Sequence, residues 1–145
     1  MKIYLDTCCL NRPFDDRSQA RVNIEAEAVR SILERCEQGD GQLASSDTLA
    51  FEVAQTTSEE RRAMLHEGLA IASERVTIES VEQRAVELEK FGLQPLDAAH
   101  LASAESAKVD WFCTCDDRLL KKCSSIPTLS FRVGLPQDLI KEWVL

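Results

Sequence analysis

Lys2-Ile3-Tyr4-Leu5-Asp6 is a short apolar run that ends directly in an acidic residue. Its apolar residues do not alternate with polar ones, so both faces of the predicted strand are expected to be buried. Strands of this kind are typical of parallel sheets that helices cover on both sides. The run therefore predicts a buried strand of an α/β protein.

A second run of the same kind, Trp111-Phe112-Cys113-Thr114-Cys115, is apolar and β-prone, and it ends at Asp116. Helices and strands alternate along the rest of the chain. Further strands are predicted at 42–45, 75–78 and 127–132, and a loop at 11–16. Helices are predicted at 18–38, from Ser46 or Asp47 through Val53, after the capping boxes Thr57-x-x-Glu60 and Ser80-x-x-Gln83, at 97–107, around 119–120 and from Pro136. This order predicts a three-layer α/β/α sandwich with a central, mainly parallel sheet, formed by residues 1–145 as one domain.

Composition excludes several classes of protein. The chain has 145 residues, 44% of them hydrophobic, and a net charge of −8 from 17 basic and 25 acidic residues. These values exclude a disordered chain, a collagen-like fibre and a coiled coil. They also argue against a basic domain that coats nucleic-acid phosphates. No stretch approaches the roughly 20 apolar residues of a membrane helix, and no signal peptide begins the chain, so a cytoplasmic location without membrane contact is expected.

The six cysteines do not follow the spacing of a zinc site. Cys8 and Cys9 are adjacent, and Cys113 and Cys115 alternate, whereas structural zinc sites use pairs with C-x₂-C spacing. We expect reduced, mostly buried thiols that pack as small hydrophobic residues, with no disulfide and no structural zinc. A metal site built from four cysteines is the alternative.

Acidic residues follow both apolar strands. The carboxyl ends of parallel strands meet at one edge of a sheet, so Asp6 and Asp116 are expected to lie together. Asp97 should start a helix at that edge, and Glu52 is on a helix whose neighbouring Leu49 and Val53 face the core. Converging carboxylates repel one another unless a cation binds them. Ligation by oxygen alone selects Mg²⁺ or Mn²⁺.

Each acid also has a structural interpretation. Asp97 and Asp116 both precede or begin helices, where aspartate is a common N-cap. Glu52 has the alternative of a solvated charge on a helix surface. Asp6 is harder to explain in this way, because a carboxylate directly after a buried strand is desolvated and needs a partner.

Four segments together resemble the PIN-domain family over nearly the whole chain. They are Ile3-Tyr4-Leu5-Asp6-Thr7, the isolated Glu52 after Ser45-Ser46, Leu96-Asp97-Ala98-Ala99-His100-Leu101-Ala102-Ser103-Ala104, and Thr114-Cys115-Asp116-Asp117. The third segment and the Thr-x-Asp beyond it are the most specific. The resemblance implies a Mg²⁺- or Mn²⁺-dependent ribonuclease like the VapC toxins of toxin–antitoxin pairs. It also implies RNA as substrate, a homodimer and a small antitoxin protein as partner.

The resemblance also implies a role for individual residues. It makes Asp6, Glu52, Asp97 and Asp116 an acidic quartet that is catalytic and holds the metal, with Glu52 inside or just outside the ligand set. Asp117 is a candidate additional ligand, and Thr7 and Thr114 are supporting hydroxyls.

Two further residues have competing interpretations. Arg12 follows the first strand and is a weak candidate for RNA contact, with pairing to Asp15 or Asp16 as the alternative; Arg118, Lys121 and Lys122 are the other basic residues nearby. His100 comes three residues after Asp97 on the same helix. We expect it to be packed and hydrogen-bonded, and a general base is the alternative.

The implied reaction is hydrolysis of RNA phosphodiester bonds, leaving a 5′-phosphate and a 3′-hydroxyl. One alternative is a catalytically silent PIN-like domain that only binds a partner, but all four acids are present in the sequence. The other is a phosphatase that uses Asp6 as a phosphorylated nucleophile. Such enzymes use Asp-x-Asp-x-Thr, and Cys8 stands where the second aspartate is needed.

Overall fold

The computed structural model describes residues 1–143 and contains a five-stranded sheet in which all neighbouring strands are parallel. The strand order is β3-β2-β1-β4-β5. The strands are β1 (Lys2–Leu5), β2 (Gln42–Ser46), β3 (Glu74–Val76), β4 (Trp111–Cys113) and β5 (Arg132–Gly134).

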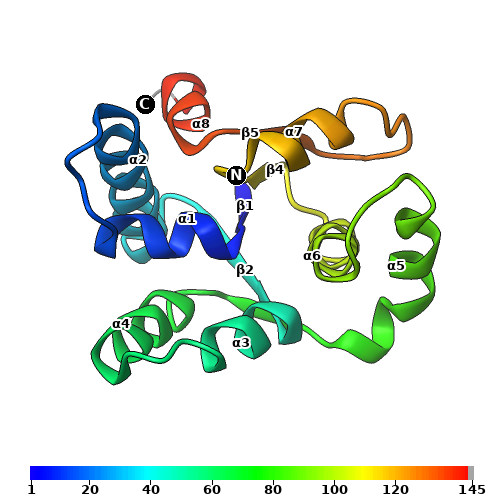
Figure 1. The fold of residues 1–145 in the computed structure, drawn as a ribbon, viewed down its shortest axis with the longest axis horizontal. Helices are drawn as coiled ribbons and strands as arrows, with labels where there is room; N and C mark the ends of the chain where they lie inside the picture. The colour runs from blue at the N-terminus through cyan, green and yellow to red at the C-terminus, as the bar shows by residue number, and fades with distance from the viewer. Residues whose placement is uncertain (144–145) are drawn as a thin grey trace.

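Helices cover both faces of the sheet. The α-helices are α1 (Thr7–Asn11), α2 (Ala20–Glu37), α3 (Asp47–Ala54), α4 (Glu59–Leu69), α5 (Glu82–Glu89), α6 (Pro95–Ser106), α7 (Asp117–Cys123) and α8 (Pro136–Glu142), and 3₁₀ turns lie at Arg12–Phe14 and Ile78–Ser80. Figure 1 shows α2 and α8 together on one side of the sheet and α5 and α6 on the other. The predicted three-layer α/β/α architecture is confirmed.

The two apolar strands are buried, as predicted, and they lie side by side in the interior of the sheet. Tyr4 and Phe112 are fully buried, and their rings stack at a centroid distance of 5.3 Å with an interplanar angle of 10°. This pair packs the neighbouring strands β1 and β4 against each other, and Phe131 extends the aromatic cluster at 6.1 Å from Phe112. The packing fixes the two strand ends that carry acidic residues.

Two capping predictions are wrong. Helix α4 is capped by Ser58, whose Oγ accepts from the amide of Arg61 at 3.2 Å, and not by Thr57. Helix α5 has Val81 as its N-cap and no side-chain cap, because the Ser80 hydroxyl instead donates to the Thr77 carbonyl within a 3₁₀ turn. In both regions more than one serine or threonine can hydrogen-bond to the backbone at the start of the helix. The hydrogen bond that forms within the local turn determines which of them caps the helix.

Within residues 1–143, no helix has both the length and the apolar character that crossing a membrane requires.

Candidate metal centre

The order of the strands creates a topological switch point at the carboxyl ends of β1 and β4, which we call the crevice. Strands β2 and β3 lie on one side of β1 in the sheet, and β4 and β5 lie on the other side. Ligands of open parallel sheets bind outside the carboxyl ends of the strands where the order reverses in this way. Asp6 follows β1 and Asp116 follows β4 at this point, and the Asp6 amide donates to the Cys113 carbonyl at 2.9 Å.

Asp6 is buried, with only 6% of its surface exposed, and hydrogen bonds hold both of its carboxylate oxygens. Its Oδ1 accepts from the amide of Thr7 at 2.8 Å, so this side chain also caps helix α1, which the sequence analysis did not predict. Its Oδ2 accepts from the hydroxyl of Thr114 at 2.8 Å. The Thr114 oxygen in turn accepts from the amide of Asp116 at 3.1 Å. One buried hydroxyl therefore connects the acids that follow β1 and β4.

Glu52 points toward the same edge from helix α3. Its Oε1 accepts from the Thr7 hydroxyl at 2.8 Å and contacts Nε2 of His100. The carboxylate is half-buried, while its Oε2 makes no hydrogen bond or ion pair within residues 1–143. Glu52 is thus oriented by two side chains and is not a solvated charge on the surface of α3.

His100 connects Glu52 to the buried core. Its Nδ1 lies 2.7 Å from the Tyr4 hydroxyl, which lies 2.7 Å from Oγ of Ser46. The Ser46 oxygen already accepts the amide of Leu49 at 3.0 Å, where it caps α3. In the neutral imidazole, Nε2–H donates to Glu52, so Tyr4 donates to Nδ1 and Ser46 donates to Tyr4. In the protonated imidazole both ring nitrogens donate, Nε2–H to Glu52 and Nδ1–H to the Tyr4 oxygen. His100 is packed and hydrogen-bonded, as predicted.

Asp97 lies in the first turn of α6 but does not cap it. The helix begins at Pro95 with Gln94 as the N-cap, two residues earlier than predicted, because proline suits the first helical position. The interpretation of Asp97 as an N-cap is therefore wrong. Its half-buried carboxylate makes no hydrogen bond or ion pair with any other described residue.

Asp116 does cap a helix. Its Oδ1 accepts from the amides of Arg118 at 2.9 Å and Leu119 at 3.4 Å at the start of α7, so the predicted capping alternative is confirmed. Its Oδ2 has no such partner in the described part of the chain. Capping orients the carboxylate and leaves one oxygen for another ligand.

Burial and neighbouring charges shift the pKa values of Asp6, Asp97, Glu52 and His100. Burial raises the pKa of Asp6 to about 7. Burial, followed by the charge of Asp6, raises the pKa of Asp97 to about 6, with further contributions from Asp116 and Glu52. Burial also raises the pKa of Glu52, but the hydrogen bond and the charge of His100 outweigh it and lower the pKa. Burial lowers the pKa of His100, and the hydrogen bond to Glu52 with the surrounding acids raises it overall.

Two predicted residues are engaged elsewhere. Asp117 forms an ion pair with Arg21 through contacts of 2.8 and 2.9 Å. Arg12 donates to the fully buried Glu25 at 2.9 Å and to Asp15 at 3.0 Å, which matches the alternative of pairing with a neighbouring aspartate. Their charges are balanced outside the acidic cluster.

The donor atoms at the crevice fit a hard divalent cation. Carboxylate oxygens of Asp6 and Glu52 lie within 4.8 Å of each other and of a His100 ring nitrogen. Asp97 is not part of this close group, but it is half-buried without a partner and the charges of Asp6, Asp116 and Glu52 act on it. A carboxylate in this position is costly unless a cation neutralises it. The nitrogens of His100 are used by Glu52 and Tyr4, so His100 supports the oxygen ligands and the donor set is the one that Mg²⁺ or Mn²⁺ prefers.

Sequence reasoning did not assign a role at the site to Tyr4, Ser46 or Cys8. A signal existed for Tyr4, since a tyrosine in a buried strand needs a partner for its hydroxyl. The Sγ of Cys8 lies 3.5 Å from Oδ2 of Asp6, but no sequence pattern indicates that contact.

Comparison with known proteins agrees with this geometry. The sequence model of the PIN domain matches residues 3–124, which is the greater part of the chain. No curated protein matches the sequence. PIN domains are in general metal-dependent nucleases, and nuclease-type function is consistent with acids that gather at the carboxyl ends of β1 and β4. The chain belongs to the PIN-domain family.

Proposed function

We propose that this protein is a Mg²⁺- or Mn²⁺-dependent endoribonuclease and the toxin of a VapC-type toxin–antitoxin pair. The observation that carries the proposal is the convergence of the Asp6 and Glu52 carboxylates, with the half-buried, unpartnered Asp97 near enough for the charge of Asp6 to raise its pKa. Such a cluster is stable when a cation is bound, and the oxygen donors favour a hard metal ion.

In this proposal Asp6, Asp97 and Asp116 hold the metal, and Glu52 lies inside or just outside the ligand set. Asp97, Asp116 and Glu52 each have a carboxylate oxygen without a hydrogen bond to another described residue. Asp6 is held in a fixed position by the Thr7 amide and the Thr114 hydroxyl. Asp117 can join only by leaving Arg21, so we treat it as an accessory residue.

A divalent cation at this site lowers the pKa of a bound water and neutralises charge on the phosphate. Hydrolysis adds water to phosphorus and breaks the P–O3′ bond, which gives a 5′-phosphate and a 3′-hydroxyl. The protein's own contribution is positioning: Thr114 and the Thr7 amide hold Asp6, while Thr7 and His100 hold Glu52. Fixed ligands reduce the reorganisation that the reaction requires.

Helix α7 offers basic side chains for RNA. Arg118 and Lys121 make no side-chain hydrogen bond or ion pair with the other described residues, and together with Lys122 they line a surface hollow of about 660 Å³ beyond Asp116. Arg12, by contrast, reaches a phosphate only if it leaves Glu25 and Asp15. We therefore expect RNA phosphates to contact α7, with Arg12 in a secondary role.

The nuclease assignment is tested with labelled single-stranded RNA. Cleavage is expected with Mn²⁺ or Mg²⁺ and is expected to be lost with EDTA, because the acids cannot bind phosphate without a cation. Calorimetry should show Mn²⁺ binding to the same preparation. Binding of Mn²⁺ without cleavage of any RNA would favour the catalytically silent domain, and cleavage that persists in EDTA would refute the metal-dependent mechanism.

A homodimer and an antitoxin complete the proposal. Phe51 and Leu96 are 56% and 42% exposed on α3 and α6, next to Glu52 and Asp97, and such apolar side chains support self-association. The acidic crevice supports an antitoxin whose basic segment enters it, since an arginine or lysine there neutralises the carboxylates as a metal ion does.

Expression together with small basic proteins encoded beside the gene tests the antitoxin. A protein that copurifies is expected to weaken Mn²⁺ binding at least about tenfold, because its cation and Mn²⁺ compete for the same acids. If the complex binds Mn²⁺ as tightly as the free protein, the antitoxin does not act by entering the crevice.

A further inference from the structure

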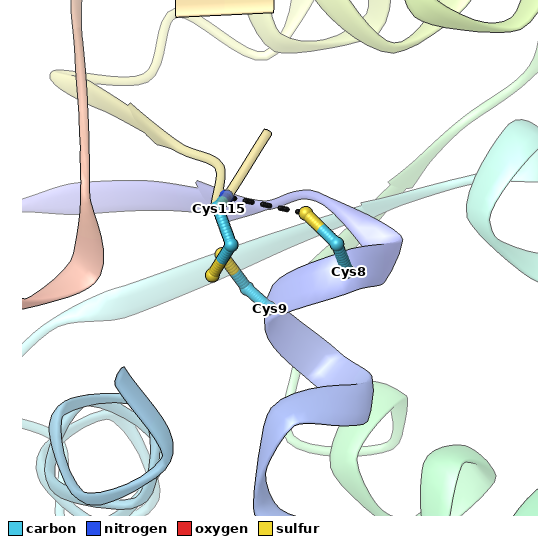
Figure 2. Close-up of side chains that lie close together, drawn as sticks. All are labelled: Cys8, Cys9 and Cys115. Carbon is cyan, nitrogen blue, oxygen red and sulfur yellow. Dashed lines mark hydrogen bonds between the residues drawn. The ribbon is translucent and has the colours of Figure 1, made fainter. Parts of the chain in front are cut away.

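Three cysteine side chains converge beside the acidic crevice. Cys8 and Cys9 belong to α1, and Cys115 lies between β4 and α7 (Figure 2). Their Sγ atoms all lie within 4.8 Å of one another, and those of Cys9 and Cys115 are 3.6 Å apart. The fold thus joins thiols that are separated by more than a hundred residues and lack any recognisable metal-site spacing.

The separation of the sulfurs suits a shared metal ion. Two sulfurs bound to one ion through bonds of about 2.3 Å lie about 3.8 Å apart in tetrahedral geometry and slightly further in trigonal geometry. The distance of 3.6 Å between Cys9 and Cys115 is close to this value. Binding therefore requires only a small adjustment of side chains that the two segments already hold together.

Surrounding groups support thiolate ligands. The amide of Cys115 donates to Sγ of Cys8 at 3.2 Å, as the dashed line in Figure 2 marks, and N–H donors of this kind orient and stabilise ligating sulfurs. Arg21 donates to the Cys115 carbonyl at 3.4 Å and so helps to hold the Cys115 segment against α1 and α2.

We propose that Cys8, Cys9 and Cys115 form a site for one thiophilic cation, Cu⁺, that is separate from the carboxylate site. Soft thiolates select Cu⁺ or Zn²⁺ among cellular ions. Structural zinc needs four ligands, and within residues 1–143 no fourth cysteine, histidine or carboxylate has a ligand atom within 4.8 Å of all three sulfurs. Three thiolates complete the ligand set of Cu⁺, whereas zinc would need a fourth ligand from solvent, so the three-sulfur geometry favours Cu⁺.

The thiol site and the carboxylate site share a border. Sγ of Cys8 lies 3.5 Å from Oδ2 of Asp6 and 3.4 Å from Oγ1 of Thr114. A cation bound to Cys8 removes the S–H donor that faces Asp6 and places a thiolate beside that carboxylate. Occupancy by Cu⁺ is therefore expected to change Mn²⁺ affinity, although the thiol site does not depend on the proposed nuclease activity.

The test is an anaerobic titration of the reduced protein against a chromophoric Cu⁺ chelator. The wild type should take one Cu⁺ per chain from the chelator. Cys9→Ser/Cys115→Ser leaves one thiol of the three and should weaken binding at least about tenfold. The matched control is Cys36→Ser/Cys123→Ser, because both residues are buried cysteines outside the cluster, and it should bind as the wild type does.

Equal loss in the two double variants would show unspecific thiol binding and overturn the proposal, as would undiminished binding in Cys9→Ser/Cys115→Ser. X-ray absorption on the wild type gives an answer even if a variant does not fold. Three sulfur neighbours per copper are expected, and two sulfurs or a first shell with nitrogen or oxygen would contradict the three-thiol site.

Discussion

Asp6→Asn and Asp97→Asn are each expected to abolish metal-dependent RNA cleavage while the metal-free fold stays intact or becomes more stable. Each substitution keeps the shape of the side chain and removes one charge from a cluster whose members repel one another. Loss of a metal ligand should lower the cleavage rate by at least about a hundredfold. Assays with Mn²⁺ and melting curves in EDTA measure the two effects separately.

The stability effect has a defined sign. The folded-state pKa of Asp6, about 7, lies above the ordinary value of 3.8, so ionising this buried group destabilises the metal-free fold. The cost grows as the pH rises above about 4 and is complete above about 7. Asp6→Asn removes it and should stabilise the apo protein at pH 7.5 by about 1 kcal/mol, with a smaller gain near pH 4. A gain that is independent of pH would contradict this cause.

Asp116 and Asp117 provide the comparison. Asn caps helices nearly as well as Asp, so Asp116→Asn should lose activity without losing stability. Asp117→Asn should cost much less activity, because Asp117 is 69% exposed and paired with Arg21. Full activity in Asp97→Asn would refute the assignment of the site. A large loss of apo stability in all the crevice variants would show that these acids are structural.

His100→Ala is expected to reduce cleavage by about ten- to a hundredfold and to weaken Mn²⁺ binding, because Glu52 loses the side chain that orients it. The RNA concentration at half-maximal rate should stay unchanged, since His100 is buried and does not reach substrate. The variant should also melt at a lower temperature, because the buried Tyr4 hydroxyl loses one of its two hydrogen-bond partners and keeps only Ser46.

Two further variants separate positioning from stability. His100→Gln keeps a donor for Glu52 at a similar reach and should recover part of the rate without restoring the melting temperature. His66→Ala changes the other histidine, which is exposed on α4, and should behave as the wild type. If His100→Gln recovers stability but not Mn²⁺ affinity, His100 does not act through Glu52.

The sequence was sufficient to predict those strands and helices whose own apolar residues show which side is buried. Strands β1 and β4 have no polar alternation, and the inward direction of Glu52 follows from Leu49 and Val53 on the same helix. Helix α1 was not predicted, because its five residues lack a helical period and its cap is the acid already assigned to the site. The strand order is also absent from local patterns, since it depends on which edges pair.

The last strand shows how packing overrides a local pattern. The apolar residues at 127–132 predicted a strand there, but β5 lies at Arg132–Gly134. Gly134 sits against the ring of Trp111, and a Cβ at this position would be only 2.8 Å from that ring. The register next to β4 therefore requires a residue without a side chain, which a count of apolar residues does not detect.

The Ser46 hydroxyl performs two tasks with one oxygen atom. It caps α3 through the amide of Leu49, and it begins the chain through Tyr4 and His100 that ends at Glu52 on the same helix. Selection for a stable fold and selection for an active enzyme therefore act on the same atom. A substitution at Ser46 changes both the cap of α3 and the hydrogen-bond chain to Glu52. This position should therefore accept fewer substitutions than its distance from the crevice suggests.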